Sequence, residues 1–389
     1  MIGVAKPSLV LDPWNGSGTT TAALARRALH GIGLDINPVM VIVAKARLLS
    51  SSVSSSLLPL AEDILGLAEK TRSLPCNDPL TDWMVPDSAV SLRSIERAVA
   101  TILLPKESRA LSQASAINSI SSLGAFYYVA LFRAVRAITE SFRTSNPTWL
   151  RMPHTPSGRV RPTRATIWSV FRQHVAQMQE ALASIPRPTP EPVNVRLIVG
   201  DARSLPEDIL DVSAVIASPP YCTRLDYAVA TRPELALLSW SCDMVQQLRA
   251  SLMGGVLTRE HREAPCTSWG PVCLTTLDAI SSHPSKASSA YYLDQYLQYF
   301  GDLVRSLMQI RSVCRRSADC ILVVQDSLYK DVHVNLPRIT KEIATYTGFE
   351  HVRSHEYAVP TSFRHLNSRS RKYRLNWTPR EAVLWFKAA

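Results

Sequence analysis

Asp211-Val-Ser-Ala-Val-Ile-Ala-Ser-Pro-Pro-Tyr221 is an apolar run that ends abruptly in two prolines. Its first part predicts a short buried strand. Proline cannot continue a sheet ladder and fixes its own φ, so the chain has to leave the sheet in a stiff, extended turn. The turn gathers the hydroxyl of Ser218, the carbonyls of Pro219 and Pro220, and the ring of Tyr221. Because ligands bind at the carboxyl ends of strands in open α/β sheets, this turn is either a binding element or only a strand ending.

A strand, a glycine turn and a helix are predicted near the start of the chain. Residues 8–11 are apolar, Gly16-Ser17-Gly18 is a tight turn, and residues 19–29 are rich in alanine and leucine. Such a unit presents backbone N–H groups to a ligand at the start of the helix. Asp12 ends the predicted strand. A carboxylate there is poorly suited to phosphate and suits a cation or an amine.

A second short strand, residues 31–35, also ends in an acid, and a helix is expected from Pro38, since proline fits the first helical position. Asp35 follows the glycine turn by about 20 residues, the spacing of the acid that binds ribose hydroxyls in nucleoside-binding α/β folds. The alternative is that Asp35 only caps the helix over residues 39–49. Ribose binding is favoured, because the acids Asp12 and Asp35 and the glycines Gly16 and Gly18 all fit the pattern of such a fold.

Residues 50–192 break the α/β rhythm. Helical periodicity covers residues 57–70, 90–104 and 117–142, and the proline-rich stretch 186–192 predicts a stiff linker. We interpret this part of the chain as a mainly helical insertion, with possible target recognition, in an α/β protein. The chain then divides into a first part of the core (1–49), the insertion (50–192) and the remainder of the core (193–389).

The α/β rhythm resumes after the linker. Strands are expected at residues 195–199, 214–217, 320–325, 350–359 and 381–386, and helices around Glu234, at 291–313 and at 334–345. The last two strands are expected to pair in antiparallel fashion at a sheet edge. Residues 243–288 are polar and irregular in pattern, which predicts a loop or lid. The fold class is therefore α/β, with a Rossmann-like sheet.

The charge balance favours a polyanionic partner. The chain has 389 residues, a formal net charge of +11 and a pI of about 9.5, which is most simply explained by binding to nucleic acid. Two basic clusters are candidates for that contact. They are Arg159, Arg161 and Arg164 in the insertion, and Arg364, Arg369, Arg371 and Lys372 near the end of the chain.

Two further properties bound the function. No apolar stretch approaches the roughly 18 residues of a membrane span, so we expect a cytoplasmic protein that makes no membrane contact. The seven cysteines include no Cys-x-x-Cys pair, and the histidines lack the spacing of metal ligands, so no metal site is predicted.

Four stretches, taken in order, resemble the motifs of amino-methylating DNA methyltransferases. Asp12-Pro-Trp-Asn-Gly-Ser-Gly-Thr-Thr20 resembles the S-adenosylmethionine-binding motif, usually Asp-Pro-Phe-x-Gly-x-Gly-Thr-Thr, with Trp14 in place of the phenylalanine. Gly33-Leu-Asp-Ile-Asn-Pro38 resembles the ribose-binding motif that follows it. Gly200-Asp201-Ala202-Arg203 resembles the motif whose acid approaches the adenine.

The fourth stretch, Ser218-Pro-Pro-Tyr221, is similar to the catalytic motif of that family in its serine form. The serine form is associated with methylation of cytosine N4, whereas Asp or Asn at this position is commoner among adenine-N6 enzymes. The matching stretches lie within residues 8–49 and 193–389, and the insertion is not covered. The resemblance implies a class I methyltransferase sheet, S-adenosyl-L-methionine as cofactor and DNA as partner.

Residue by residue, the resemblance implies two sets of site residues. The catalytic set is Ser218, Pro219, Pro220 and Tyr221. The cofactor-binding set is Asp12, Pro13, Trp14, Gly16, Gly18, Thr19, Asp35, Ile36, Asp201 and Ala202. The insertion and residues 243–288 are the candidates for target recognition, because that element is variable in the family.

One departure from the family concerns the start of the chain. Family members often have a helix before the first strand that closes over the cofactor, and only seven residues precede Ser8 here. We therefore expect that a protein partner or a second copy of the chain could complete the cofactor pocket.

The resemblance implies a mechanism that depends mainly on positioning. The exocyclic amine of cytosine is a poor nucleophile, and acceptors at Ser218 and Pro219 would favour a more tetrahedral nitrogen and receive a proton. The base would be flipped from the duplex, with Tyr221 stacked on it. The alternatives are the same chemistry on adenine N6 or on an RNA base, and a catalytically silent nucleic-acid-binding subunit of a restriction-modification or defence complex.

Overall fold

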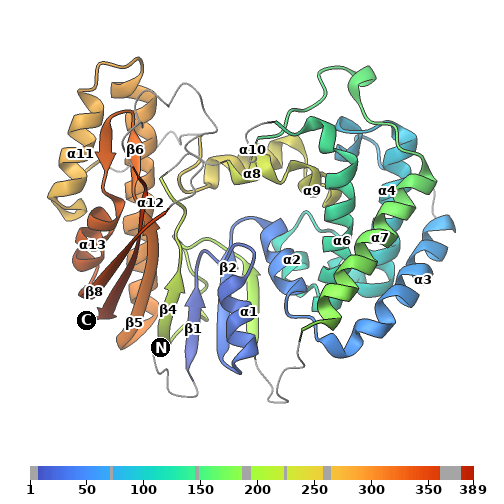
Figure 1. Cartoon of the computed structure of the whole chain (residues 1–389), viewed down its shortest axis with the longest axis horizontal. Helices are drawn as coiled ribbons and strands as arrows, with labels where there is room; N and C mark the ends of the chain where they lie inside the picture. The colour runs from blue at the N-terminus through green and yellow to red at the C-terminus, as the bar shows by residue number, and fades with distance from the viewer. Residues whose placement is uncertain are drawn as a thin grey trace.

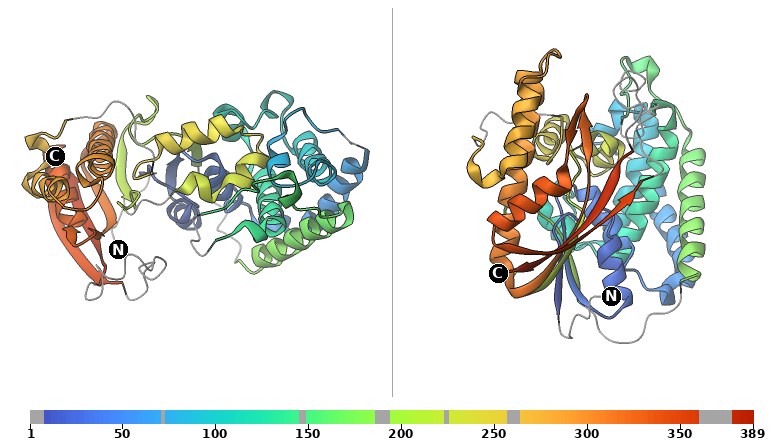
Figure 2. Two further views of the ribbon diagram at one scale, coloured as in Figure 1. Left: turned by 90° about the horizontal axis from the view of Figure 1, so that it is seen from above. Right: turned by 60° about the vertical axis from the view of Figure 1, so that its left-hand side comes forward.

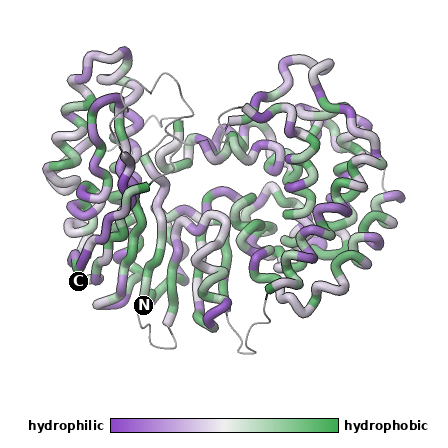
Figure 3. The backbone as a smooth tube through the Cα atoms, in the orientation of Figure 1, coloured by the Kyte–Doolittle hydropathy of each residue, from purple (hydrophilic) through white to green (hydrophobic). Residues whose placement is uncertain are grey.

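The structure, a computed structural model, describes residues 8–70, 73–144, 149–185, 194–222, 226–256, 264–359 and 378–389. The described residues form a mixed α/β protein around one seven-stranded sheet, with the strand order β3-β2-β1-β4-β5-β9-β8. Figure 1 shows this sheet between two groups of helices, and Figure 3 shows hydrophobic residues along its central strands and more hydrophilic ones at the end that holds β8. The α/β class predicted from the sequence is confirmed, and the strand order is compatible with a Rossmann-like fold.

The strands of the large sheet are short near the start of the chain and longer near its end. They are β1 (Leu9–Asp12), β2 (His30–Asp35), β3 (Val195–Val199), β4 (Val212–Ala217), β5 (Cys314–Gln325), β8 (Phe349–Ala358) and β9 (Arg380–Ala388). The strands β1 to β5 pair in parallel, whereas β9 runs antiparallel to both β5 and β8. The antiparallel pair that the sequence predicts at the sheet edge is therefore confirmed.

The direction of winding reverses between β1 and β4. From β1 the chain moves outward to β2 and β3, and it then returns to place β4 on the other side of β1. In open α/β sheets such a switch point leaves a crevice at the carboxyl ends of the two strands, where ligands bind. Asp12 ends β1, and the Ser218–Tyr221 turn follows β4, so both lie at this switch point.

Helices cover the sheet and form a lobe beside it. Along the chain they are α1 (Thr19–Arg26), α2 (Pro38–Ala46), α3 (Leu57–Lys70), α4 (Pro86–Leu103), α5 (Ala114–Ser119), α6 (Ser122–Ile138), α7 (Arg164–Ala183), α8 (Tyr227–Ala230), α9 (Arg232–Leu237), α10 (Cys242–Ser251), α11 (Pro271–Ser281), α12 (Leu293–Val313) and α13 (Leu336–Tyr346). Figure 2 shows α11, α12 and α13 together at the end of the molecule that holds β5, β8 and β9.

Two elements predicted from the sequence are wrong. Residues 243–288 were expected to be irregular, but the described part of this segment contains most of α10 and all of α11. Val245 and Leu248 of α10 are buried in the core shared with α2 and α6, and Leu277 and Ile280 of α11 are buried in the core beside α12. The single helix expected over residues 117–142 is split into α5 and α6, since the Ser121 hydroxyl accepts from the Gly124 N–H and starts a new helix. A two-stranded hairpin, β6 (Ser327–Tyr329) with β7 (Val332–Val334), was not expected.

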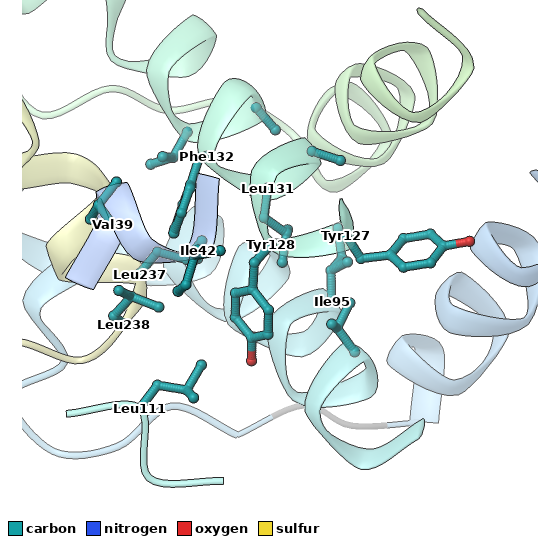
Figure 4. Close-up of a cluster of buried hydrophobic side chains, with 14 of the residues drawn as sticks. Val39, Ile42, Ile95, Leu111, Tyr127, Tyr128, Leu131, Phe132, Leu237 and Leu238 are labelled. Carbon is teal, nitrogen blue, oxygen red and sulfur yellow. The ribbon is translucent and has the colours of Figure 1, made fainter. Parts of the chain in front are cut away.

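The helices α3 to α7 form the helical lobe, and this lobe shares one core with α2 and with α8 to α10. Buried residues of α2, of the helices between residues 57 and 183, and of α9 form a single apolar cluster. Figure 4 shows Val39 and Ile42 of α2 facing Tyr128 and Phe132 of α6, with Leu237 beside them. The insertion is therefore packed against the sheet's own helices, and it reaches the segment that follows the Ser218–Tyr221 turn.

A buried arginine joins the lobe to α9. The Arg93 side chain is 2% exposed and donates to both carboxylate oxygens of Asp78, at 2.8 and 3.0 Å, and to Glu96 at 3.0 Å. It also donates to the carbonyls of Leu237 (2.6 Å) and Ala236 (3.1 Å) at the end of α9. Every partner of this guanidinium is protein, because water has no access to it.

Removal of this arginine should therefore be costly. Arg93→Ala removes the cationic partner of two buried carboxylates, Asp78 and Glu96, and the donor to the Leu237 carbonyl. We expect it to lower the free energy of unfolding by about 3–5 kcal/mol. The matched control is Arg172→Ala, which removes an ion pair to Glu62 with both side chains about half exposed, and should cost less than about 1 kcal/mol. Urea unfolding measures both, and equal losses would contradict the assigned role of Arg93.

Candidate functional site

Three predicted site elements meet where the carboxyl ends of neighbouring strands lie side by side, and we refer to this end of the sheet as "this edge". Asp12 is the last residue of β1, Asp35 is the last residue of β2, and Ser218 directly follows β4. Since β1 pairs in parallel with both β2 and β4, these three strand ends are neighbours. In Figure 1, α8 and α10 lie beyond this edge.

The glycine turn after β1 folds back onto β2. The N–H of Asn15 donates to the Leu34 carbonyl (2.8 Å), and the Asn15 side chain accepts from the Thr21 hydroxyl (3.0 Å). The N–H of Gly16 donates to Asp35 Oδ2 at 2.9 Å. The turn that directly follows Asp12 in the chain therefore also holds the carboxylate of Asp35 through a backbone donor.

The two predicted cofactor-binding glycines have different surroundings. Gly18 has φ 84°, and a Cβ atom there would lie 2.6 Å from the Ala44 Cβ, so glycine is needed for the turn to pack on α2. Gly16 has φ 51°, and a Cβ atom there would meet nothing within 4 Å. The space beside the Gly16 Cα is therefore open, as required where a ligand approaches the backbone closely.

Burial makes the negative charge of Asp12 unfavourable. The side chain is 3% exposed, and this burial raises the pKa of Asp12 to about 7, although hydrogen bonds from Thr20 and from the Trp14 N–H oppose the shift. The nearby charge of Asp35 raises it further. The site thus favours a bound cation, whose charge would replace the missing solvation.

Asp35 is held in place by two backbone donors. Besides the Gly16 N–H, the Asn37 N–H donates to Asp35 Oδ1 at 2.8 Å, and burial raises the pKa of Asp35 to about 6 despite both bonds. Asn37, and not Asp35, is the N-cap of α2, because its side chain accepts from the Val39 N–H at 3.1 Å. Each carboxylate oxygen of Asp35 retains a lone pair for a further donor such as a hydroxyl.

The Ser218–Tyr221 turn is fixed by three separate elements. Ser218 Oγ can donate its one hydrogen either to the Val323 carbonyl of β5, at 3.1 Å, or to Tyr221 Oη, at 3.3 Å. Tyr221 Oη donates to Glu381 Oε1 of β9 at 2.6 Å. Tyr299 Oη of α12 donates to the Pro220 carbonyl at 2.9 Å. Within the described ranges, the Pro219 carbonyl makes no hydrogen bond.

The remaining predicted cofactor residues differ in their surroundings. Pro13 and Ala202 are buried, Trp14 and Ile36 are half buried in the two main cores, and the exposed Thr19 hydroxyl accepts from Arg47 at 3.2 Å. Asp201 follows β3 and forms an ion pair with Arg203, which also contacts Asp302 at 2.8 Å. The carboxylate of Asp201 is thus already neutralised within the protein.

The segment after the turn is anchored to α2. Asp226 caps α8 by accepting from the Val229 N–H and pairs with Arg249 at 2.8 Å, so its carboxylate is satisfied. The Asn37 side chain donates to the Thr231 hydroxyl at 3.0 Å. Tyr227 is 41% exposed, and burial followed by the charge of Asp35 raises the pKa of its hydroxyl.

The predicted nucleic-acid residues are only partly described. Arg164 is engaged within the protein, because it lies 4.2 Å from the Trp168 ring and 3.7 Å from Glu69. Arg159 is half buried and Arg161 is exposed in the segment before α7. The second basic cluster, Arg364, Arg369, Arg371 and Lys372, lies outside the described residues.

Some residues of the site carry no sequence signal that could have identified them. Glu381 is 160 residues from Tyr221, and Tyr299 is 79 residues from Pro220. Asn37 and Asn15 do lie inside the predicted motifs, and their short polar side chains next to Gly or Pro are typical of turns and helix caps.

Two cavities lie away from this edge. One of about 360 Å³ is lined by Leu9, His30 and Asn194 at the amino ends of β1 to β3. The other, of about 120 Å³, lies between Trp83 of the lobe and Arg232 of α9. Neither is lined by Asp12, Asp35 or Ser218. We place the candidate site at the strand ends that carry these three residues.

Searches for metal and membrane features are negative. Across the described ranges, no group of three or more His, Cys, Asp and Glu side chains could hold a metal ion. In the same part of the chain, no single helix has both the length and the apolarity to cross a membrane, although the bent pair Pro38–Ala46 and Ser51–Lys70 passes on length and composition alone.

Comparison with models of known protein families gives no match, and comparison with curated proteins finds no relative.

The raised pKa of Asp12 predicts a pH-dependent stability. The folded value of about 7 exceeds the value of 3.8 for an unperturbed aspartate, so the folded state binds the proton more tightly. The contribution of Asp12 to the stability of the folded state is therefore greatest below about pH 4 and is lost as the pH rises towards 7. We expect Asp12→Asn to be more stable than the wild type at pH 8, by on the order of 2 kcal/mol, with no advantage at pH 4.

Thermal or urea unfolding across pH 4–8 measures this difference. The control is Glu62→Gln, because the hydrogen bond from Arg172 lowers the pKa of Glu62 and reverses the sign. Its effect should be a loss of stability at neutral pH that disappears in acid. A pH-independent effect of Asp12→Asn would contradict the burial argument.

Proposed function

We propose that this protein is an S-adenosylmethionine-dependent methyltransferase of the class I fold that methylates the exocyclic N4 amine of cytosine in DNA. The observation that carries the proposal is the meeting of Asp12, Asp35 and the Ser218–Tyr221 turn at the switch point of the sheet. This is the edge where ligands bind in open α/β sheets. The net charge of +11 supports a nucleic-acid partner.

The donor set fits the cofactor. The open surface beside Gly16 leaves room for a ligand at the start of α1, and the spare lone pairs of Asp35 suit ribose hydroxyls. The unfavourable charge of Asp12 suits a sulfonium or ammonium group. When bound, the cofactor would supply an electrophilic methyl group at this edge.

The acceptors of the turn fit an amine. An exocyclic amine carries two N–H donors, and the turn offers the Pro219 carbonyl and the lone pairs of Ser218 Oγ. A hydroxyl substrate has only one hydrogen and would leave one acceptor unpaired, which is unfavourable once water is excluded. The prolines keep both acceptors in fixed positions, so little reorganisation is needed when the base arrives.

Cofactor binding should release protons. A cation bound near Asp12 and Asp35 lowers their pKa values, so at pH 6.5 each carboxylate gives up part of its proton. Calorimetry in two buffers with different ionisation enthalpies measures the number released. S-adenosylhomocysteine lacks the sulfonium charge and should release fewer protons, and Asp12→Asn should remove most of the difference. Equal release by both ligands would show that Asp12 does not face the sulfonium.

The reaction itself is tested by mass spectrometry of nucleosides after incubation with DNA and the cofactor. We expect N4-methylcytosine from the wild type and a rate lower by about 100-fold for Ser218→Ala, with cofactor affinity unchanged. The control is Ser213→Ala, whose hydroxyl donates to the Leu9 carbonyl inside the sheet. N6-methyladenine or methylated RNA would replace the cytosine assignment, and DNA binding without any methylation would indicate a silent binding subunit.

A further inference from the structure

Ser218, Tyr221 and Glu381 form a chain of hydrogen bonds that leads away from the candidate site. Ser218 Oγ is oriented to donate to Tyr221 Oη at 3.3 Å, and Tyr221 Oη donates to Glu381 Oε1 at 2.6 Å. The second distance is typical of a hydroxyl bound to an ionised carboxylate. Both donors point in the same direction, from the turn after β4 to the carboxylate on β9.

We propose that this chain is a proton relay that carries the proton of the methylated amine from Ser218 through Tyr221 to Glu381. The proposal rests on the proposed function, since it needs an amine nitrogen at Ser218. It adds Glu381, which no motif in the sequence indicates, as the terminal acceptor. Glu381 does not touch the substrate and acts through Tyr221.

The proposed step conserves atoms, electrons and charge. The nitrogen–carbon bond forms while the carbon–sulfur bond of the sulfonium donor breaks, and the electron pair of that bond goes to sulfur. The methylated nitrogen then gives its surplus proton to Ser218 Oγ. The hydrogen of Ser218 moves to Tyr221 Oη, and the hydrogen of Tyr221 moves to Glu381 Oε1. The positive charge of the sulfonium and the negative charge of Glu381 both disappear.

Each link has a physical reason. Ser218 Oγ also lies 3.1 Å from the Val323 carbonyl oxygen, the alternative acceptor of its hydrogen, but an amide oxygen is too weak a base to take the proton. Burial, followed by the hydrogen bond to Glu381, raises the pKa of the Tyr221 hydroxyl, so tyrosine stays neutral and can only pass a proton on. Proton transfer along such a positioned chain contributes typically 10²- to 10⁴-fold in enzymes that depend on it.

Glu381 is suited to be the end of the relay. Its neighbour Arg380 pairs with Glu356 at 2.9 Å, and among the described residues no cation is paired with Glu381. The charge of this carboxylate is therefore not already neutralised by a neighbouring cation among those residues. The side chain is half exposed, so the proton can leave to water after each turnover.

The test compares two variants that interrupt the chain at different points. Glu381→Gln keeps an oxygen that accepts from Tyr221 but cannot take a proton, and Tyr221→Phe removes the middle link. We expect each to slow single-turnover methyl transfer by at least about 10-fold and to lower the solvent deuterium isotope effect towards 1. The double variant should be no slower than either single variant, because both break the same path.

Binding provides a readout that is independent of turnover. The affinity of Glu381→Gln for DNA in the presence of S-adenosylhomocysteine should equal that of the wild type, since only proton transfer is lost. The control for charge is Glu356→Gln, which removes a carboxylate of the neighbouring strand that pairs with Arg380. It should leave both the rate and the isotope effect unchanged.

The outcomes separate the relay from the proposed function. A wild-type enzyme that methylates DNA, together with a Glu381→Gln variant of equal rate and isotope effect, overturns the relay and leaves the function intact. A slow variant with an unchanged isotope effect and weaker DNA binding would make Glu381 a purely structural anchor. No methylation by the wild type, on DNA or RNA, would instead overturn the proposed function.

Discussion

Two carboxylates at adjacent strand ends are the constraint on which the candidate site depends. Asp12 is almost fully buried, and the cost of burying its charge is partly offset by hydrogen bonds from Thr20 and from the Trp14 N–H. Asp35 is held by the N–H groups of Gly16 and Asn37. The glycine turn has to double back with positive φ to bring one of these donors into place. The fold thus holds two unfavourable charges close together, which is consistent with a site that gains stability when a cation binds.

The helical lobe supports α8 and α9, the helices that come after the Ser218–Tyr221 turn in the chain. It reaches α9 through Arg93, which donates to the carbonyls that end this helix, and it reaches the end of α8 through Arg136, which donates to the Ala230 carbonyl at 2.8 Å. From the other side, Asn37 holds Thr231. The segment that follows the Ser218–Tyr221 turn is thereby fixed between the sheet and the lobe. A disturbance of the buried ion pairs of Arg93 would therefore reach the strand ends through α8 and α9.

The sequence predicts those parts of the fold that depend on local chemistry. Glycine, proline and aspartate identify where β1, β2 and β4 end, because each restricts the backbone or satisfies a nearby donor. The partners of Arg93 and Tyr221 could not be predicted, since they lie up to 160 residues away in sequence and depend on how layers pack. The helices within residues 243–288 are hidden by serine, threonine and proline in the sequence, and they form because Trp269 and Ile280 are buried.

The serine at position 218 is explained by its neighbours as well as by any substrate. Its hydroxyl donates to the Val323 carbonyl of β5. An aspartate at this position would place a carboxylate beside that carbonyl oxygen, and two acceptors in contact repel each other. The contact with Val323 therefore favours a donor at position 218 independently of any ligand. It follows that discrimination between cytosine and adenine would depend mainly on the groups that surround the ring, such as Tyr221 and the segment from Tyr227 onward, rather than on the serine alone.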